Sequence, residues 1–245
     1  MSLSVIIIAK NESHAIEDCL ESVSFADEII LIDGGSTDDT VEKAKALGAT
    51  VHVNSHWQGF GFQKNLALHH ATKNWVLSID ADERVTPELK NAIQRAMAEH
   101  QFDVYRLPRS SSYCGHFMRH GGWWPDYVVR LFKRGVAEFS ADRVHERIET
   151  DKPIGTLRHP LMHLTYETLE EVIDKTNHYS TLGAEMLFDK GRRGGLGVAS
   201  LKALWAFLRT YILRAGFLDG GYGFLLAVSN AQTTFYRYAK LWLKR

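Results

Sequence analysis

The first hundred residues alternate between short β-rich runs and longer stretches with helical periodicity. Runs of this length that are largely apolar are typical of strands buried on both faces. The runs are 4–8, 28–32, 50–54 and 75–79. The periodic stretches predict amphipathic helices over 14–23, 40–48, 62–72 and 86–100. This alternation predicts an α/β fold with a mostly parallel, Rossmann-like sheet and helices on both faces.

Polar residues ahead of two predicted helices are typical of helix N-termini. Asn11 and Ser13 are candidate N-caps for the helix over 14–23. Ser36 and Asp39 have the spacing of a capping box ahead of the next helix. The polar loops after the first two strands are therefore predicted to start helices.

Three of the predicted strands end in polar or acidic segments. Right-handed crossovers bring the carboxyl ends of parallel strands to one edge of a sheet, where ligands bind in open α/β folds. The segments are Ala9-Lys10-Asn11-Glu12, Asp33-Gly34-Gly35-Ser36 and Asp80-Ala81-Asp82. We expect them to line one crevice.

The acidic cluster Asp80, Asp82 and Glu83 follows a predicted buried strand. Carboxylates this close repel one another, and burying them is costly unless a cation shares the site. The chain has neither a G-x-G-x-x-G fingerprint nor a P-loop to cradle phosphate. Asp80 and Asp82 therefore predict a site for a hard divalent cation, Mg²⁺ or Mn²⁺, that bridges to phosphate oxygens.

The formal net charge is zero, but the charges are unevenly distributed. Residues 1–100 carry 8 Lys/Arg against 15 Asp/Glu, whereas residues 190–245 carry 10 against 1. Apolar and aromatic residues form broad helical faces over 201–214 and 224–245, as in helices that lie in a membrane interface. We expect a basic amphipathic helical tail over 186–245 that associates with an anionic membrane surface. Packing of this tail on the rest of the chain, or dimerisation, is the alternative.

Several signals of secretion and of covalent cross-linking are missing. Cys19 and Cys114 are too few for a disulfide framework and lack zinc-site spacing. The N-terminal "MSLSVIIIAKNES" has no basic region of a signal peptide, and no unbroken apolar run reaches about 18–20 residues. We expect a protein of the reducing cytoplasm.

Three quoted segments carry a resemblance to a known family. "SVIIIAKNE", "IDGGSTDDT" and "SIDADE" resemble the nucleotide-sugar domain of inverting family 2 glycosyltransferases with the GT-A fold. The triplet Asp80-Ala81-Asp82 matches the D-x-D motif of that family. The later "WWPDYVVRLFKRG", "VHERIE" and "FLDGGYGFLLA" resemble the small lipopolysaccharide-core β-1,4-glucosyltransferases of Gram-negative bacteria.

This resemblance implies an inverting, metal-dependent enzyme. It would be a cytoplasmic protein, peripheral on the cytoplasmic face of the bacterial inner membrane, with no nucleic-acid partner. Its donor would be a UDP-sugar, UDP-glucose in the narrower group, and its acceptor a heptose of the lipopolysaccharide core (lipid A-core). Polyprenyl phosphate or another envelope glycan is an alternative acceptor, and a non-catalytic nucleotide-binding protein at the membrane is the alternative of another class. The implied domains are a catalytic GT-A domain over 1–185, with donor half 1–100 and acceptor half 101–185, and the tail over 186–245.

The resemblance also implies roles for particular residues. Those of the nucleotide-sugar site are Ala9, Lys10, Asn11, Glu12, Asp33, Gly34, Lys64, Asp80, Ala81 and Asp82. Among them Asp33 would accept a hydrogen bond from the nucleotide base, and Lys64 would lie near the diphosphate. Asp80 and Asp82 would bind the metal, with His145 or His163 as a further ligand.

Inversion at the anomeric carbon requires one carboxylate base that faces the acceptor hydroxyl. Asp126, in "WWPDYVVRLF", and Glu146, in "RVHERI", are the two candidates. Trp123 and Trp124 would form an aromatic platform for the acceptor sugar, with ordinary core packing as the alternative.

Overall fold

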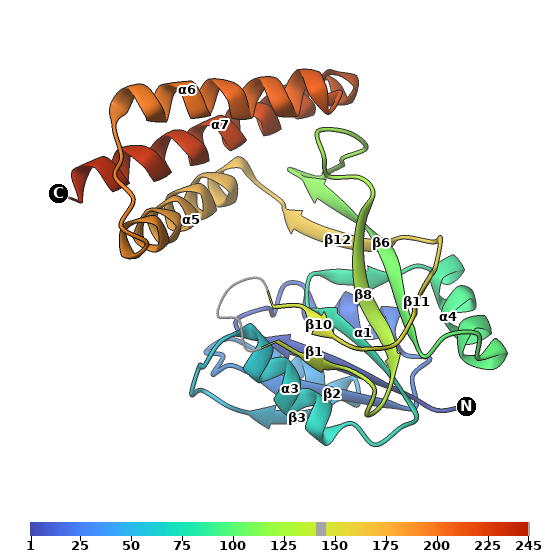
Figure 1. Ribbon diagram of the computed structural model, residues 1–245. Helices are drawn as coiled ribbons and strands as arrows, with labels where there is room; N and C mark the ends of the chain where they lie inside the picture. Colours follow the sequence, from blue (N-terminus) through green and yellow to red (C-terminus); the bar gives the residue numbers. More distant parts are fainter. Residues whose placement is uncertain (141–145, 245) are drawn as a thin grey trace. The chain divides into compact units, whose positions relative to one another are not determined.

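The computed structural model describes residues 1–140 and 146–244 (Figure 1). The strands are β1 (Leu3–Ala9), β2 (Glu28–Asp33), β3 (Thr50–Val53), β4 (Trp75–Asp80), β5 (Glu83–Val85), β6 (Val104–Tyr113), β7 (His116–Phe117), β8 (Asp126–Lys133), β9 (Glu138–Phe139), β10 (Ile148–Glu149), β11 (Ile154–Thr156) and β12 (Leu161–Tyr166). The α-helices are α1 (Ile16–Ser22), α2 (Thr40–Ala46), α3 (Phe60–His70), α4 (Pro87–Glu99), α5 (Leu169–Asp189), α6 (Leu196–Leu208) and α7 (Gly220–Leu243). A π-helical turn (Arg209–Leu213) follows α6, and a 3₁₀ turn (Gly216–Asp219) precedes α7.

Ten of the described strands form one sheet. Its main path runs β3-β2-β1-β4-β8-β6-β12-β5, and β7 and β11 both pair with β6. The strands β3, β2, β1 and β4 are parallel, as predicted from their alternation with helices. Beyond them β8 joins β4 antiparallel, and β12 pairs antiparallel with β5. The sequence did not predict these antiparallel strands.

The two faces of the parallel strands are covered by different helices. In β1, Leu3, Val5 and Ile7 belong to one core cluster, which also holds buried residues of α1, α2 and α4. Ile6, between them, belongs to a second cluster with the buried Ala67 of α3. Side chains alternate between the faces of a strand, so an almost continuous apolar run is buried on both sides. The predicted layers are therefore confirmed.

The chain folds into two compact units. The first holds residues 1–109 and 127–163, and the second holds residues 110–126 together with 164 onward. The sequence-based division into donor, acceptor and tail parts concerns function and stays a prediction. Its boundary at residue 185 falls inside helix α5.

Three long helices form most of the second unit. Helix α7 packs against both α5 and α6, and Figure 1 shows α6 and α7 side by side. Lys240 links α7 to α5, because its Nζ donates hydrogen bonds to Ser180 Oγ (2.9 Å) and Thr181 Oγ1 (2.7 Å) of α5. The phenol of Tyr113, which is fully buried, bonds Ser229 Oγ of α7 at 2.7 Å. The predicted C-terminal helical region is confirmed.

Both cysteines are free thiols, as predicted. Cys19 is fully buried in the first core cluster, and burial raises the pKa of its thiol to about 12. A thiol held neutral in this way is unreactive, so Cys19 serves packing.

Candidate active site

The loops that follow β1 and β2 bind each other directly. The N–H of Asn11 donates to Ser36 Oγ, and the N–H of Thr37 donates to Asn11 Oδ1, each at 2.8 Å. Asn11 has a φ of 57°, a left-handed conformation that asparagine tolerates better than most residues. These contacts fix the edge of the sheet where β1 and β2 end.

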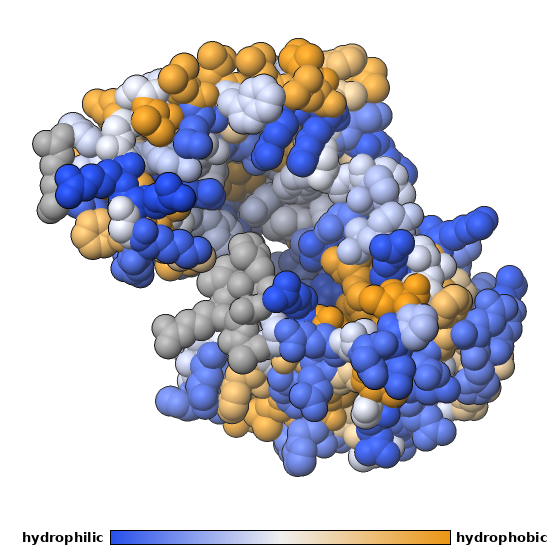
Figure 2. All heavy atoms as spheres, in the orientation of Figure 1, coloured by the Kyte–Doolittle hydropathy of each residue, from blue (hydrophilic) through white to orange (hydrophobic). Residues whose placement is uncertain are grey.

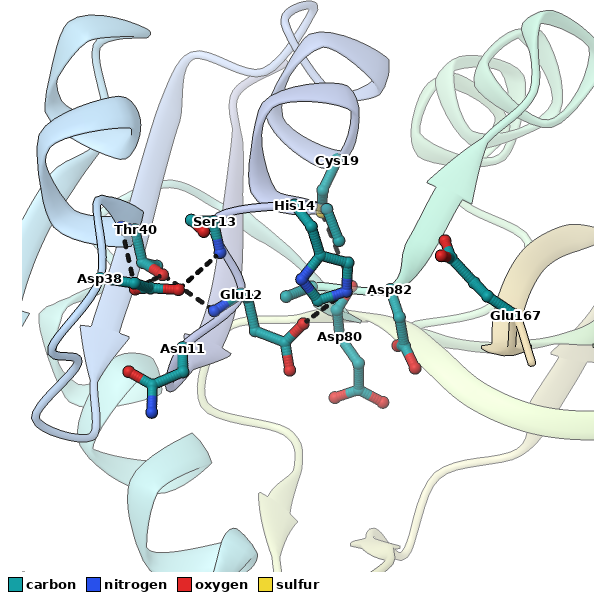
Figure 3. Close-up of polar contacts among 12 residues, drawn as sticks. Asn11, Glu12, Ser13, His14, Cys19, Asp38, Thr40, Asp80, Asp82 and Glu167 are labelled. Atoms are coloured by element: carbon teal, nitrogen blue, oxygen red, sulfur yellow. Dashed lines mark hydrogen bonds and ion pairs between the residues drawn. The ribbon is translucent and has the colours of Figure 1, made fainter. Parts of the chain in front are cut away.

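A second pair of contacts completes this link (Figure 3). The N–H of Glu12 donates to Thr40 Oγ1 at 2.8 Å, and the N–H of Ser13 donates to Asp38 Oδ2 at 3.1 Å. A hydrogen bond from the Thr40 hydroxyl is the main reason that the pKa of Asp38 is lowered to about 2.

The predicted helix caps are wrong. Helix α1 has Ala15 as its N-cap and α2 has Asp39, and neither makes a side-chain cap bond. The polar groups of Asn11, Ser13 and Ser36 hold the two loops together instead. A capping pattern reports only local sequence, whereas these partners lie about 25 residues away.

Asp33 is buried at the end of β2 and organises its own turn. Its carboxylate accepts from the N–H of Gly35 at 2.9 Å and from both the N–H and the hydroxyl of Ser36. Gly35, with a φ of 86°, has the backbone conformation that favours glycine. The predicted bond between Asp33 and a nucleotide base stays a prediction.

The neighbouring predicted residues lie along the same edge. The N–H of Gly34 donates to the carbonyl of Ala9 at 2.8 Å. A side chain at Gly34 would press on Lys10, which is exposed. The carbonyl of Ala81 accepts from Arg84 Nη1 at 2.8 Å. The strand ends therefore meet as predicted, and Figure 3 shows the side chains of Glu12, Asp80 and Asp82 on one side of this edge.

Asp80 is held by two cationic side chains. Lys64 Nζ lies 2.9 Å from Asp80 Oδ1, and Arg130 Nη2 lies 2.7 Å from Asp80 Oδ2. Burial opposes ionisation of Asp80, but the charges of Arg130 and Lys64 outweigh it and hold its pKa well below the usual range. Much of the negative charge that the sequence placed here is thus balanced by the protein itself.

Glu83 is a site residue to which the sequence assigned no role. It is fully buried, its Oε1 accepts from Arg130 Nη2 at 2.6 Å, and its Oε2 accepts from the N–H of Asp80 at 2.9 Å. Burial raises its pKa, an effect that the charge of Arg130 counters. Glu83 therefore fixes both the backbone of Asp80 and the guanidinium that holds the Asp80 side chain. The position of Glu83 in the acidic cluster was the feature of the sequence that could have identified it as a site residue.

Asp82 points to a different partner. Its Oδ2 lies 3.1 Å from Nε2 of His163, on β12. About a third of the Asp82 side chain is exposed, whereas that of His163 is mostly buried. Of the two predicted histidines, His163 thus lies beside Asp82, and His145 lies outside the described residues.

Lys64 joins the D-x-D segment to a candidate base. Its Nζ lies 2.8 Å from Glu146 Oε1, in addition to its contact with Asp80. The lysine side chain is almost completely buried in α3. Lys64 is therefore not a solvated residue of the helix surface.

Asp82 and His163 fit a divalent cation that shares its shell with substrate. They bring a carboxylate oxygen and an imidazole nitrogen together, and Mg²⁺ or Mn²⁺ in phosphate sites often has few protein ligands. Among the described residues, no group of three or more His, Cys, Asp or Glu side chains could hold an ion. Phosphate oxygens would have to complete the shell, because Asp80 is engaged by Lys64 and Arg130.

The remaining predicted residues belong to the second unit. Trp123 packs with the rings of Tyr113 and Tyr166 at centroid distances of 5.8 and 6.2 Å. Arg119 stacks over Trp124 at 5.4 Å. Asp126 is the first residue of β8. Packing thus accounts for Trp123, and the acceptor role of both tryptophans stays a prediction.

Comparison with known proteins adds independent evidence. The family model described as glycosyl transferase family 2 matches residues 4–155. An uncharacterized glycosyltransferase of Rickettsia typhi is 31% identical over 98% of this chain and 86% of its own length. The lipopolysaccharide core biosynthesis glycosyltransferase LpsC of Rhizobium meliloti is 30% identical over 99% of this chain and 92% of its own.

A solved structure shares the fold. Residues 1–349 of TarS from S. aureus superpose with a TM-score of 0.52 at 17% identity, covering 98% of this chain and 84% of that one. The mostly parallel sheet with its D-x-D edge is the GT-A fold of a glycosyltransferase. The chain belongs to glycosyl transferase family 2. The prediction of an enzyme is confirmed, and the alternative of a non-catalytic nucleotide-binding protein is set aside.

Proposed function

We propose that this glycosyltransferase is an inverting, metal-dependent enzyme that moves glucose from UDP-glucose to a heptose of the lipopolysaccharide core, at the cytoplasmic face of the inner membrane. The proposed donor site rests on one observation, that the two aspartates of the D-x-D segment have different partners. The charge of Asp80 is balanced by Lys64 and Arg130, whereas the Asp82 carboxylate contacts His163. The acceptor half rests on likeness to LpsC along almost the whole chain.

The site residues have distinct tasks in this reaction. Asp82 and His163 would hold the cation, which supplies charge that offsets the negative charge on the leaving diphosphate. Lys64 and Arg130 fix the Asp80 carboxylate, and the Asn11 and Asp33 loops shape the edge that the nucleotide contacts. The TarS fragment that shares this fold was crystallised in complex with UDP-GlcNAc, which supports a uridine nucleotide as the donor.

Selective stabilisation by UDP tests the donor site. We expect UDP with Mn²⁺ to raise the melting temperature, and ADP, GDP and CDP to have little effect. A ligand that binds only the folded state, at a concentration of about 100 times its Kd, raises the free energy of unfolding by about 2.7 kcal/mol. The measurement is differential scanning fluorimetry of each nucleotide with and without Mn²⁺. A response to all four nucleotides alike would contradict a uridine site.

Transfer of labelled glucose to extracted envelope lipids tests the acceptor. Purified enzyme, UDP-[¹⁴C]glucose and membranes from a heptose-containing strain should yield labelled lipopolysaccharide core. Membranes from a strain that lacks core heptose are the matched control and should yield none. Label that appears in the polyprenyl-phosphate fraction instead would contradict the core acceptor.

The catalytic base is tested by comparing two substitutions. Glu146 is held by Lys64 at 2.8 Å, so we assign it to positioning and assign proton removal to Asp126. Asp126→Asn should lower kcat by about 10²–10⁴-fold with unchanged stabilisation by UDP. Glu146→Gln should weaken UDP binding more than it lowers kcat. If Glu146→Gln instead lowers kcat more than Asp126→Asn does in steady-state kinetics, Glu146 is the base.

A further inference from the structure

One face of helix α6 is apolar and exposed. Leu201, Leu204, Trp205 and Leu208 of α6, with Ile212 of the π-helical turn that follows, recur at the spacing of one helical face. Their exposed fractions range from 39% for Leu208 to 71% for Leu201. Figure 2 shows hydrophobic residues gathered along this helix. We call these five residues the apolar stripe.

The opposite face of this helical stretch packs on α7 through small residues. Ala199, Ala206 and Thr210 are buried, and Asn230 of α7 donates its Nδ2 hydrogen to Thr210 Oγ1 at 3.1 Å. Small residues at these positions let the two helices approach closely. The packing therefore fixes the apolar stripe outward along the length of α6.

Basic side chains border the apolar stripe. Lys202 and Arg209 lie one heptad apart, about a quarter-turn from the centre of the stripe, and both are exposed. Lys202 Nζ also lies 5.1 Å from the ring of Tyr238, which orients it. Arg192 and Arg193, just ahead of the helix, are exposed as well. Basic residues beside an apolar face are complementary to anionic lipid.

Further exposed apolar side chains extend this surface beyond the helix. Leu213 closes the π-helical turn, and Phe217 and Leu218 lie on the 3₁₀ turn. Each is about half exposed or more. A soluble surface seldom carries this much contiguous apolar area without a partner.

We propose that the apolar stripe docks the protein on an anionic lipid bilayer, with α6 lying in the plane of the interface. A second copy of the chain is the less suitable partner, because residues 190–245 carry ten basic residues against one acidic residue and two such surfaces repel. Lipid headgroups supply the missing negative charge. This inference does not depend on the donor or acceptor sugar.

The packing of α6 also decides against a spanning orientation. Leu196–Leu213 is long and apolar enough to cross a bilayer, by length and composition alone. Helix α7 packs beside it, however, and leaves Lys202 and Arg209 of this segment exposed. A spanning α6 would draw these charges into hydrocarbon, which is costly. In the interface plane, only the apolar stripe enters the acyl region.

Vesicle flotation of the full-length protein tests this proposal. The protein should float with vesicles of phosphatidylethanolamine and phosphatidylglycerol, and bind less to phosphatidylcholine alone. The triple variant Leu201→Gln, Leu204→Gln, Trp205→Gln should bind at least roughly tenfold more weakly, since each apolar side chain contributes to partitioning. Lys202→Gln with Arg209→Gln should weaken the preference for the anionic vesicles, because each basic residue near the surface contributes about 1 kcal/mol.

Controls separate docking from misfolding and from self-association. Val53→Gln, at an exposed apolar position on β3 in the first unit, should bind vesicles as the wild type does. The triple variant should keep the wild-type melting temperature, because its three positions are exposed. Undiminished flotation of the triple variant, or a wild type that ignores both vesicles, overturns the proposal. A wild-type dimer that the triple variant converts to a monomer also overturns the proposal, because the stripe is then a dimer interface. Resistance of the membrane-bound protein to extraction by alkaline carbonate overturns it too, because it indicates a spanning helix.

Discussion

Replacing Arg130 with methionine lowers the free energy of unfolding by about 3–5 kcal/mol, since it strands buried carboxylates without their partner. Arg130 is almost fully buried, and its Nη2 bonds both Asp80 and Glu83. Asp80 keeps Lys64, whereas Glu83 is left with the more distant Arg109 at 3.7 Å. Urea unfolding followed by circular dichroism measures the loss.

Two further variants show whether the stranded charge is the cause. Arg134→Met, at an exposed position just past β8, should change stability little. Adding Glu83→Gln to Arg130→Met should restore part of the loss, because an amide costs less to bury than an unpaired carboxylate. Without Arg130, burial raises the pKa of Glu83 further. The variant should therefore regain stability relative to wild type as pH falls and Glu83 takes up a proton. A loss independent of pH would point to packing instead.

Asp82→Asn should remove the Mn²⁺-dependent part of UDP binding and lower the rate of sugar transfer by about 10²–10³-fold. Asparagine has nearly the same shape but lacks the charge that holds a cation. Because Asp82 is partly exposed and pairs with His163 at a single oxygen, the unfolding free energy without ligand should change little. Fluorimetry with UDP and Mn²⁺, and transfer kinetics, measure the two effects.

His163→Gln and Asp151→Asn complete this experiment. His163→Gln should weaken Mn²⁺ binding by about 10–100-fold, in the range of losses for residues that support a metal site. Asp151 is an exposed carboxylate elsewhere in the first unit, and its replacement should have no effect. An Asp82→Asn variant that responds to UDP and Mn²⁺ as well as wild type would overturn the metal role of Asp82.

Local pattern was sufficient for the parallel half of the fold. The runs that became β1, β2 and β4 are apolar because both faces of those strands are buried, and this requirement is visible in sequence. The topology of parallel strands then placed the three polar segments at one edge, as found. Strands β8 and β12 were not predicted from local pattern. Their positions in the sheet depend on pairing with β4 and β5, which are distant in the chain.

The acidic cluster shows the same division between sequence and structure. From the sequence it follows that Asp80, Asp82 and Glu83 come at the end of a buried strand and that their negative charge requires a counter-charge. The groups that meet this charge are known only from the folded chain. Lys64 from α3 pairs with Asp80, Arg130 from β8 pairs with both Asp80 and Glu83, and His163 from β12 lies beside Asp82. Ion-pair partners brought together by folding need no fixed spacing along the chain. A periodic pattern reports which side chains are buried, but only packing determines which buried charges meet.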